Sequence, residues 1–251
     1  MRLLEYESKL LLREAGLETP AGRLATSPAE AEDIAKELGG PAVLKPQVPF
    51  GGRGKAGALA FAEDPGEVAG VAERLLSTPL RGHQVQQLLV EQRVRSRQEL
   101  FLGITYDTSV KRPVLLASPS GGVEIEAVAE TVHRHLLPLH QPWPTFLSRE
   151  VAAGLGLAGR PLLRLTAIID RLVAAFLDLD ALLVEINPLI LTPEGQLVAV
   201  DAHIELDDDA LYRHKELAAR LDLAGRGQRP LTDFERKAAE IDHADHRGVA
   251  G

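Results

Sequence analysis

The chain has 251 residues, of which 45% are hydrophobic and 25% charged, which is enough to bury one large or two smaller cores. A net charge of -8 argues against a protein that binds duplex nucleic acid through a broad basic surface. The lack of cysteine excludes disulfides, a thiol nucleophile and thiolate metal sites, and no apolar run reaches the roughly 20 residues of a membrane span. A cytoplasmic location is therefore expected.

Apolar spacing, capping residues and glycines predict alternating helices and strands. In chain order the predicted elements are a helix over 4–15, a helix over 28–38, strands over 42–47 and 58–62, a helix over 64–76, strands over 86–94, 99–106 and 112–117, helices over 148–154 and 161–178, and a hairpin over 182–203. The tail over 207–251 is predicted to be helical and weakly packed. The segment over 20–95 is predicted to be a small subdomain inserted into a larger one, which comprises 1–19 and 96–245.

The run from Gly52 to Gly57 has the pattern of a phosphate-binding glycine loop. A dinucleotide-binding fold would need a helix directly after the glycines, and a P-loop would need Ser or Thr after Lys55; neither is present. The run therefore predicts a glycine flap between antiparallel strands, where backbone amides, Arg53 and Lys55 contact phosphates. Lys45, on the incoming strand, can point toward the same pocket. A flexible hairpin with a solvated basic tip is the alternative interpretation.

The predicted hairpin carries a second group of polar residues. If it turns about Glu194, Asn187 faces Asp201 and Glu185 faces His203, with all four on one face. A carboxylate beside an amide oxygen suits Mg²⁺, which takes its other ligands from water and phosphates. A bulge near the turn would send Asp201 to the opposite face, and a solvated edge hairpin is the other alternative. The opposite face is predicted to be an apolar core surface made of Val184, Ile186, Ile190, Val198 and Val200.

Taken in order, these motifs resemble the beta subunit of succinyl-CoA synthetase and its acyl-CoA ligase relatives. The matching runs cover nearly the whole chain: Leu4-Glu5-Tyr6 with Lys9, 44–48 with 51–57, 90–91 with 99–103, 121–126, and 185–189. The resemblance implies an α/β (α+β) protein with an ATP-grasp fold, in which two α+β subdomains clasp the nucleotide. The family usually has Asp-Gly-Lys where this chain has Asp201-Ala202-His203, and His-Ala where it has Pro49-Phe50.

The resemblance also implies a role for each matching residue. The implied roles are phosphate binding by Lys45, Gly52, Arg53 and Gly54, base contacts by Glu91 and the backbone of Val94, a ribose contact by Glu99, Mg²⁺ ligation by Asn187 and Asp201, and phosphoryl transfer at Glu185 and Arg53. The phosphoryl group of ATP, with GTP possible, would pass to a histidine on an alpha-type partner subunit that also carries the CoA site. The implied product is an acyl-CoA made from succinate or a similar acid, with ADP and phosphate, as in the tricarboxylic acid cycle.

The resemblance sets the family's second, ligase domain after about residue 246, with 246–251 as a linker. We therefore expect this chain to act with a separately encoded or truncated ligase domain, and not to complete the synthesis alone. Two alternatives stay open: an ATP-grasp ligase subunit for malate, citrate or acetate, and a non-catalytic nucleotide-binding module. No nucleic acid or membrane partner is expected.

Overall fold

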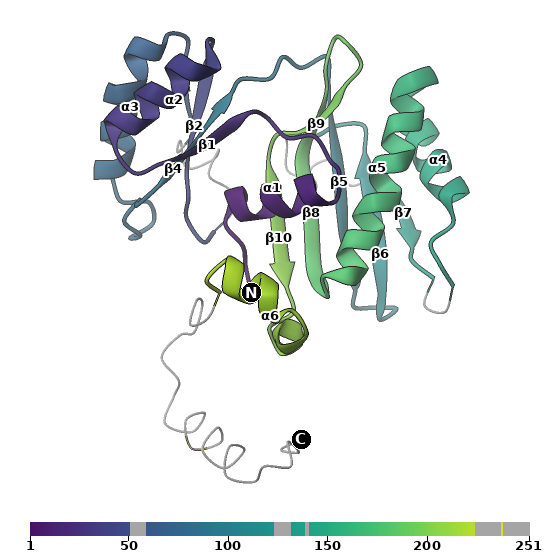
Figure 1. The fold of residues 1–251 in the computed structure, drawn as a ribbon. Helices are drawn as coiled ribbons and strands as arrows, with labels where there is room; N and C mark the ends of the chain where they lie inside the picture. The colour runs from purple at the N-terminus through teal and green to yellow at the C-terminus, as the bar shows by residue number, and fades with distance from the viewer. Residues whose placement is uncertain (51–58, 123–131, 139–140, 224–236, 238–251) are drawn as a thin grey trace.

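The computed structural model describes residues 1–50, 59–122, 132–138, 141–223 and 237 (Figure 1). The predicted glycine flap, with Gly52, Arg53, Gly54 and Lys55, and the matching run over 123–126 lie outside the described residues. Within the described part of the chain, no helix is long and apolar enough to cross a membrane.

The described residues form two antiparallel sheets. The smaller has the strand order β1-β4-β2-β3, with bounds β1 Gly22–Ala25, β4 Leu88–Gln92, β2 Ala42–Pro46 and β3 Ala60–Ala62. The larger has the order β10-β8-β5-β6-β7 with β9 also beside β8, and bounds β10 Ala202–Leu206, β8 Ala181–Leu191, β5 Gln98–Asp107, β6 Arg112–Ser118, β7 His133–Leu136 and β9 Leu197–Ala199. Every described strand of the small sheet lies within the segment predicted to be inserted; the boundaries of that subdomain stay a prediction.

Two helices, α2 (Pro28–Leu38) and α3 (Pro65–Ser77), cover the small sheet. The predicted start and end of α2 are confirmed, because Ser27 Oγ accepts a hydrogen bond from the Glu30 amide and Gly39 closes the helix with a φ of 68°. The core between helices and sheet contains many alanines, among them Ala31, Ala35 and Ala72. The sequence did not reveal β1, since only one residue of this short strand is buried.

Three helices pack against the large sheet: α1 (Glu5–Glu14), α4 (Thr145–Gly154) and α5 (Gly159–Asp178). α1 and α5 lie across the same face of the sheet (Figure 1). An apolar stripe of α5 faces the sheet, with Leu165, Ile169, Leu172 and Phe176 fully buried and Leu162 partly buried. This core is rich in leucine and isoleucine and contains one phenylalanine.

The C-terminal part of the described chain returns to the large sheet. A 3₁₀ helix, η2 (Asp208–Arg213), and α6 (Lys215–Arg220) follow β10 and lie near the N-terminus (Figure 1). Asp180, in the turn between α5 and β8, accepts hydrogen bonds from Arg213 Nε at 3.0 Å and pairs with His214 Nε2 at 2.8 Å. These charged contacts hold η2 against the turn that precedes β8.

The predicted hairpin has the predicted register. His203 pairs with Glu185, the Asn187 amide donates to the Asp201 carbonyl at 3.2 Å, and Leu191 pairs with Leu197. The turn near Gly195 therefore introduces no slip.

One part of the hairpin prediction is wrong. Val184 and Ile186 face the core, but Ile190, Val198 and Val200 line the opposite side, where a cavity opens. The reason is a bulge: Asn187 and Pro188 of β8 together stand opposite the single residue Phe101 of β5. The extra residue shifts the alternation of side chains along β8 by one position. The residues of β8 after Pro188 therefore point to the opposite face of the sheet from the one predicted.

Candidate functional site

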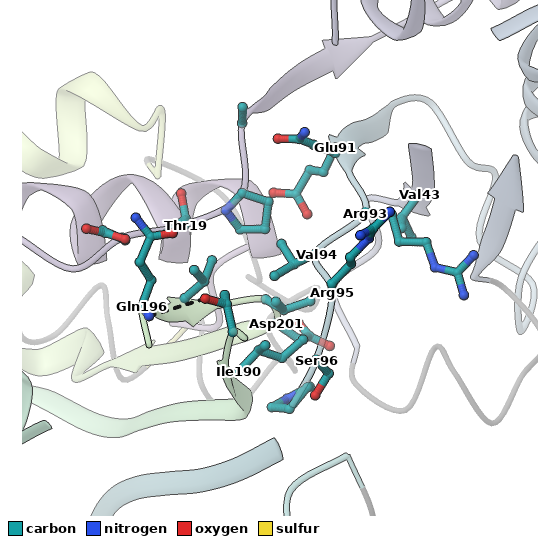
Figure 2. A pocket seen from close by; sticks show the side chains of 18 of the residues that line it. Thr19, Val43, Glu91, Arg93, Val94, Arg95, Ser96, Ile190, Gln196 and Asp201 are labelled. Atoms are coloured by element: carbon teal, nitrogen blue, oxygen red, sulfur yellow. Dashed lines mark hydrogen bonds between the residues drawn. The ribbon is translucent and has the colours of Figure 1, made fainter. Parts of the chain in front are cut away.

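A cavity of about 2130 Å³ opens between the two sheets and is large enough for a nucleotide. Its walls come from β2, β3, β4 and the segment after β4 on one side, and from β8, β9, the turn between them and the residues just before β10 on the other. Figure 2 shows Glu91 and Val94 on the first side, with Ile190 and Asp201 belonging to the hairpin. Thr19, from the segment after α1, also points into this space.

All the described residues that the sequence singled out for the site line this one cavity. They are Lys45, Glu91, Val94, Glu99, Glu185, Asn187 and Asp201. They come from both sheets and from segments more than 150 residues apart, so the fold, not the chain order, brings them together. Gly52, Arg53 and Gly54 lie outside the described residues. The role of each residue stays a prediction.

Lys45 does not extend freely into the cavity. Its Nζ donates to Glu5 Oε1 at 2.8 Å and to the Val200 carbonyl at 2.5 Å, and lies 3.1 Å from Glu91 Oε2. Burial alone would lower the pKa of Lys45, but the charges of Glu5, Glu91 and Asp201 together raise it above its usual value. Lys45 therefore stays positively charged at the base of the cavity.

A second buried lysine completes this group. Lys9 Nζ lies 2.8 Å from Glu5 Oε1 and donates to the two Glu91 carboxylate oxygens at 2.7 and 2.5 Å. Burial is the largest influence on Lys9 and lowers its pKa, against the attraction of Glu5 and Glu91. Its short contacts to three carboxylate oxygens are those of an ammonium group. We call Glu5, Lys9, Lys45 and Glu91 the buried ionic cluster; none has a side chain more than 4% exposed.

The hairpin presents oxygen atoms suited to a hard cation. Asn187 and Asp201 line the cavity together, and Asn187 Oδ1 accepts a hydrogen bond from the Gly122 amide at 2.7 Å, which fixes the amide group. Glu99 lies beside the same glycine: a Cβ on Gly122 would come within 2.4 Å of Glu99 Oε2. Among the described residues no group of three or more His, Cys, Asp or Glu is placed to hold a metal. A carboxylate and an amide oxygen fit Mg²⁺ that is shared with phosphates, and not a cation held by protein alone.

A smaller cavity of about 90 Å³ adjoins the large one. Both are lined by Glu185, Asn187 and Asp201, and the smaller is also lined by Arg2 and His203. Arg2 Nε donates to His203 Nε2 at 2.6 Å. Glu185 therefore lies where the two cavities meet.

Sequence reasoning missed Glu5 and Lys9 as parts of the site. A signal was present: in α1 the residues Glu5, Ser8, Lys9 and Leu12 follow the helical spacing of one face, and all are buried. Charged residues at buried positions of a helix need partners, and here Lys9 and Glu5 pair with each other and with Glu91 of β4 and Lys45 of β2. Arg93, Arg95 and Gln196 also line the cavity without having been predicted (Figure 2).

Comparison with known proteins gives a consistent result. Residues 2–191 match a family model described as "ATP-grasp domain". The chain is 42% identical over 228 residues to the beta subunit of an ADP-forming succinate–CoA ligase from Rubrobacter xylanophilus, covering 89% of this chain and 59% of the relative. It is 40% identical over 222 residues to the beta subunit of a GDP-forming succinate–CoA ligase from Thermus thermophilus, covering 87% and 58%.

Solved structures share the fold. An ATP citrate lyase from Methanothrix soehngenii, in complex with citrate and coenzyme A, matches with a TM-score of 0.69 and 20% identity, over 97% of this chain and 60% of that one. At this identity the likeness concerns the fold alone. The chain spans about three fifths of the length of the curated relatives it matches.

Proposed function

Because the chain belongs to the ATP-grasp family and is similar to the ATP-grasp portion of succinate–CoA ligase beta subunits, we propose that it is the Mg-ATP-binding part of an ADP-forming acyl-CoA ligase. The observation that carries this proposal is the convergence of seven predicted site residues, from both sheets, on one cavity. The acid would be succinate or a similar carboxylate, joined to CoA as ATP is split to ADP and phosphate.

In this proposal the cavity holds the nucleotide between the two sheets. Lys45, with Gly52, Arg53 and Gly54, binds the phosphates, and Glu91, Val94 and Glu99 contact the base and ribose. The support is positional: Glu91 and Val94 lie on one wall (Figure 2), and Glu99 lies beside the hairpin that carries Asp201.

Asn187 and Asp201 would hold Mg²⁺ together with the phosphates. A bound Mg²⁺ neutralises charge on the phosphates and orients them for transfer. The chain's own contribution is to fix two oxygen ligands: the Gly122 amide holds Asn187 Oδ1, and the paired backbones of β8 and β10 hold Asp201 next to it. Positioning and charge neutralisation are sufficient for a phosphoryl transfer, so no nucleophile on this chain is required.

Glu185 would meet the phosphoryl acceptor, a histidine on an alpha-type partner subunit that also binds CoA. Its place where the two cavities meet supports this role, because a side chain entering from the smaller cavity would approach the phosphates. An imidazole nitrogen would form a bond to the γ-phosphorus as the bond to the ADP oxygen breaks, and Glu185 would orient the ring. A ligase domain, on this or a separate chain, would complete the acyl-CoA synthesis.

The first test is ligand-dependent unfolding of the 251-residue chain. Mg-ATP at about 100 times its dissociation constant should stabilise a specific binder by roughly 2.7 kcal/mol. The absence of any shift at millimolar Mg-ATP would contradict the proposal. GTP is the natural comparison, since a relative at 40% identity is named as GDP-forming.

The second test concerns transfer. Mixing the chain with candidate alpha-type subunits and γ-labelled ATP should place acid-labile label on a partner histidine. Tight nucleotide binding with no transfer to any such subunit would favour a non-catalytic nucleotide-binding module. Supplying succinate, malate, citrate or acetate with CoA to a complete assembly would then identify the acid.

A further inference from the structure

We propose that Phe61 is a contact residue for the base of the nucleotide and that Arg93 is the residue that positions its ring. The inference rests on the proposed function, since it concerns the same cavity, and it adds a base contact that the sequence did not reveal. Among the described residues that line the large cavity, Phe61 is the one aromatic side chain. It is 56% exposed and is therefore accessible to a ligand in this space.

The register of the small sheet places Phe61 in one row with a predicted base contact. Phe61 of β3 is the partner of Val43 of β2, and Val43 is in turn the partner of Glu91 of β4. Partners across a sheet point to the same face, and all three side chains line the large cavity. Figure 2 shows Val43 and Glu91 on this wall. The row therefore carries a carboxylate at one end, an aromatic ring at the other, and an apolar side chain between them.

The spacing of this row suits a planar base. Two steps between neighbouring strands separate the backbones of Phe61 and Glu91 by about 9–10 Å. A base lying over Val43 would then meet the Glu91 carboxylate at one side and the Phe61 ring at the other. Ile190 and Val198 give the opposite wall of the cavity an apolar surface, against which the second face of the base can pack.

Arg93 holds the ring in place. Its guanidinium carbon lies 5.2 Å from the centroid of the Phe61 ring, which is within the range of a cation–π contact. The guanidinium also pairs with Glu63, and the Arg93 amide donates to the Pro41 carbonyl at 2.9 Å. Because both ends of Arg93 are fixed, its planar head restricts the rotation of the ring that it covers.

Arg93 does not stand between the ring and the base. Glu63 lies two residues after Phe61, which in the antiparallel pair of β2 and β3 is the direction away from Lys45. Because Arg93 pairs with Glu63, its side chain crosses the sheet one row further from Lys45 than the row of Phe61 and Val43. The ring therefore stays open toward Val43 and toward Lys45, the predicted phosphate contact.

The test measures the dissociation constant of Mg-ATP by calorimetry on the full chain. Phe61→Ala should raise this constant about tenfold, because an aromatic contact with the base is lost. Phe61→Tyr keeps the ring and should stay within about threefold of wild type, whereas Phe61→Leu keeps apolar surface without a ring and should resemble Phe61→Ala. Magnesium tripolyphosphate, which has no base, should bind wild type and Phe61→Ala alike. Wild-type affinity for Mg-ATP in Phe61→Ala or Phe61→Leu, or a parallel loss for tripolyphosphate, would overturn the assignment.

The role of Arg93 requires a cycle of variants, since the loss of a cation could also weaken phosphate binding. Arg93→Met should raise the dissociation constant of Mg-ATP about threefold in the wild-type background and leave it unchanged in the Phe61→Ala background. The reason is that a positioning residue acts only through the ring that it holds. Equal losses in the two backgrounds, or no loss in either, would show that Arg93 does not position Phe61.

A matched control is Phe146→Ala on α4. Phe146 is 68% exposed and lines neither cavity, so the Mg-ATP affinity of this variant should equal that of wild type. Phe61 is exposed as well, so its truncation should leave the fold intact, which circular dichroism checks. If the wild-type chain does not bind Mg-ATP, the proposed function fails and the role of Phe61 fails with it. If the wild type binds and Phe61→Ala binds equally well, only the role of Phe61 is overturned.

Discussion

The two sheets and the boundary between them are stabilised in different ways. Each sheet has its own apolar core, beneath α1, α4 and α5 in the large sheet and beneath α2 and α3 in the small one. The boundary, by contrast, contains the buried ionic cluster: Glu5 and Lys9 come from α1, Lys45 from β2 and Glu91 from β4. Apolar contacts are non-directional, whereas buried ion pairs need matched charges at fixed positions.

The two cores also differ from each other. The large core includes Phe176 and many leucines and isoleucines, and the small core contains seven buried alanines. Apolar stabilisation grows with the area buried, so the small sheet should be the less stable part of the molecule. A less stable unit beside a cavity can move when a ligand enters, and this fits a sheet that closes over a nucleotide.

The largest expected effect comes from breaking the large core. Phe176→Ala should lower the free energy of unfolding by about 3–5 kcal/mol, because a fully buried ring leaves a cavity. Urea denaturation followed by circular dichroism measures the change. Phe146→Ala is the matched control: its side chain is 68% exposed, and the loss should stay within about 0.5 kcal/mol. Equal losses for the two variants would contradict the description of this core.

Breaking the small core should give a smaller and more local effect. Leu88→Ala removes a fully buried side chain of β4, and we expect a loss of about 2–4 kcal/mol. Hydrogen exchange should show faster exchange in β1 to β4 while the protection of β5 and β8 is retained. The control is Phe61→Ala on β3, whose side chain is 56% exposed. A uniform loss of protection in both sheets would mean that the two cores unfold as one unit.

The next prediction concerns Asp201 of the hairpin, which lines the cavity between the two sheets. If the proposed function is correct, Mg-ATP at about 100 times its dissociation constant stabilises the wild type by roughly 2.7 kcal/mol, and Asp201→Ala should remove most of this, because a proposed Mg²⁺ ligand is lost. Thermal unfolding with and without Mg-ATP measures this difference. Asp209→Ala, an exposed aspartate of η2, is the control and should keep the full shift. A full shift in Asp201→Ala would remove Asp201 from the metal site.

The sequence predicted helix ends and the hairpin turn well, because the signals for them lie in neighbouring residues. Ser27 and Gly39 mark the ends of α2, and the turn about Glu194 determines which residues of the hairpin face each other. The bulge at Asn187 and Pro188 was not predictable in this way, because it is defined by the pairing of β8 with a distant strand. As a result, Ile190 was assigned to the wrong face.

The buried ionic cluster was missed for the same reason. Glu91 was expected to contact a base and Lys45 a phosphate, yet Lys9 and Glu91 are 82 positions apart, and Lys45 and Glu5 are 40 apart. The spacing of Glu5 and Lys9 on one helix turn shows that they can pair, but only the fold shows that both are buried. Local motifs and the family resemblance therefore predicted residues that line one cavity, and the tertiary structure showed how Lys45 and Glu91 are linked to Glu5 and Lys9.

The smallest expected effect concerns an ion pair at the surface, which extends the comparison from buried to exposed charges. Hydrogen bonds from Arg213, and then from His214, hold the pKa of Asp180 below its usual value. A lowered carboxyl pKa stabilises the folded state above the unfolded value of about 3.9, and that contribution is lost as the pH falls through the folded value. Asp180→Asn should therefore lower the melting temperature at pH 7 by about 1–3 °C, with a smaller difference at pH 3.

Differential scanning calorimetry at the two pH values measures this effect, and Asp178→Asn, two residues earlier at the end of α5, is the control. A difference that grows toward acid pH would have the wrong sign for a carboxylate stabilised by cations. If Asp180→Asn lowered the melting temperature at pH 7 as much as a core truncation such as Phe176→Ala, this exposed ion pair would contribute as much stability as a fully buried side chain. The contrast between a solvated pair at η2 and the enclosed cluster at Lys9 would then lose its physical basis, since it rests on the shielding of exposed charges by water.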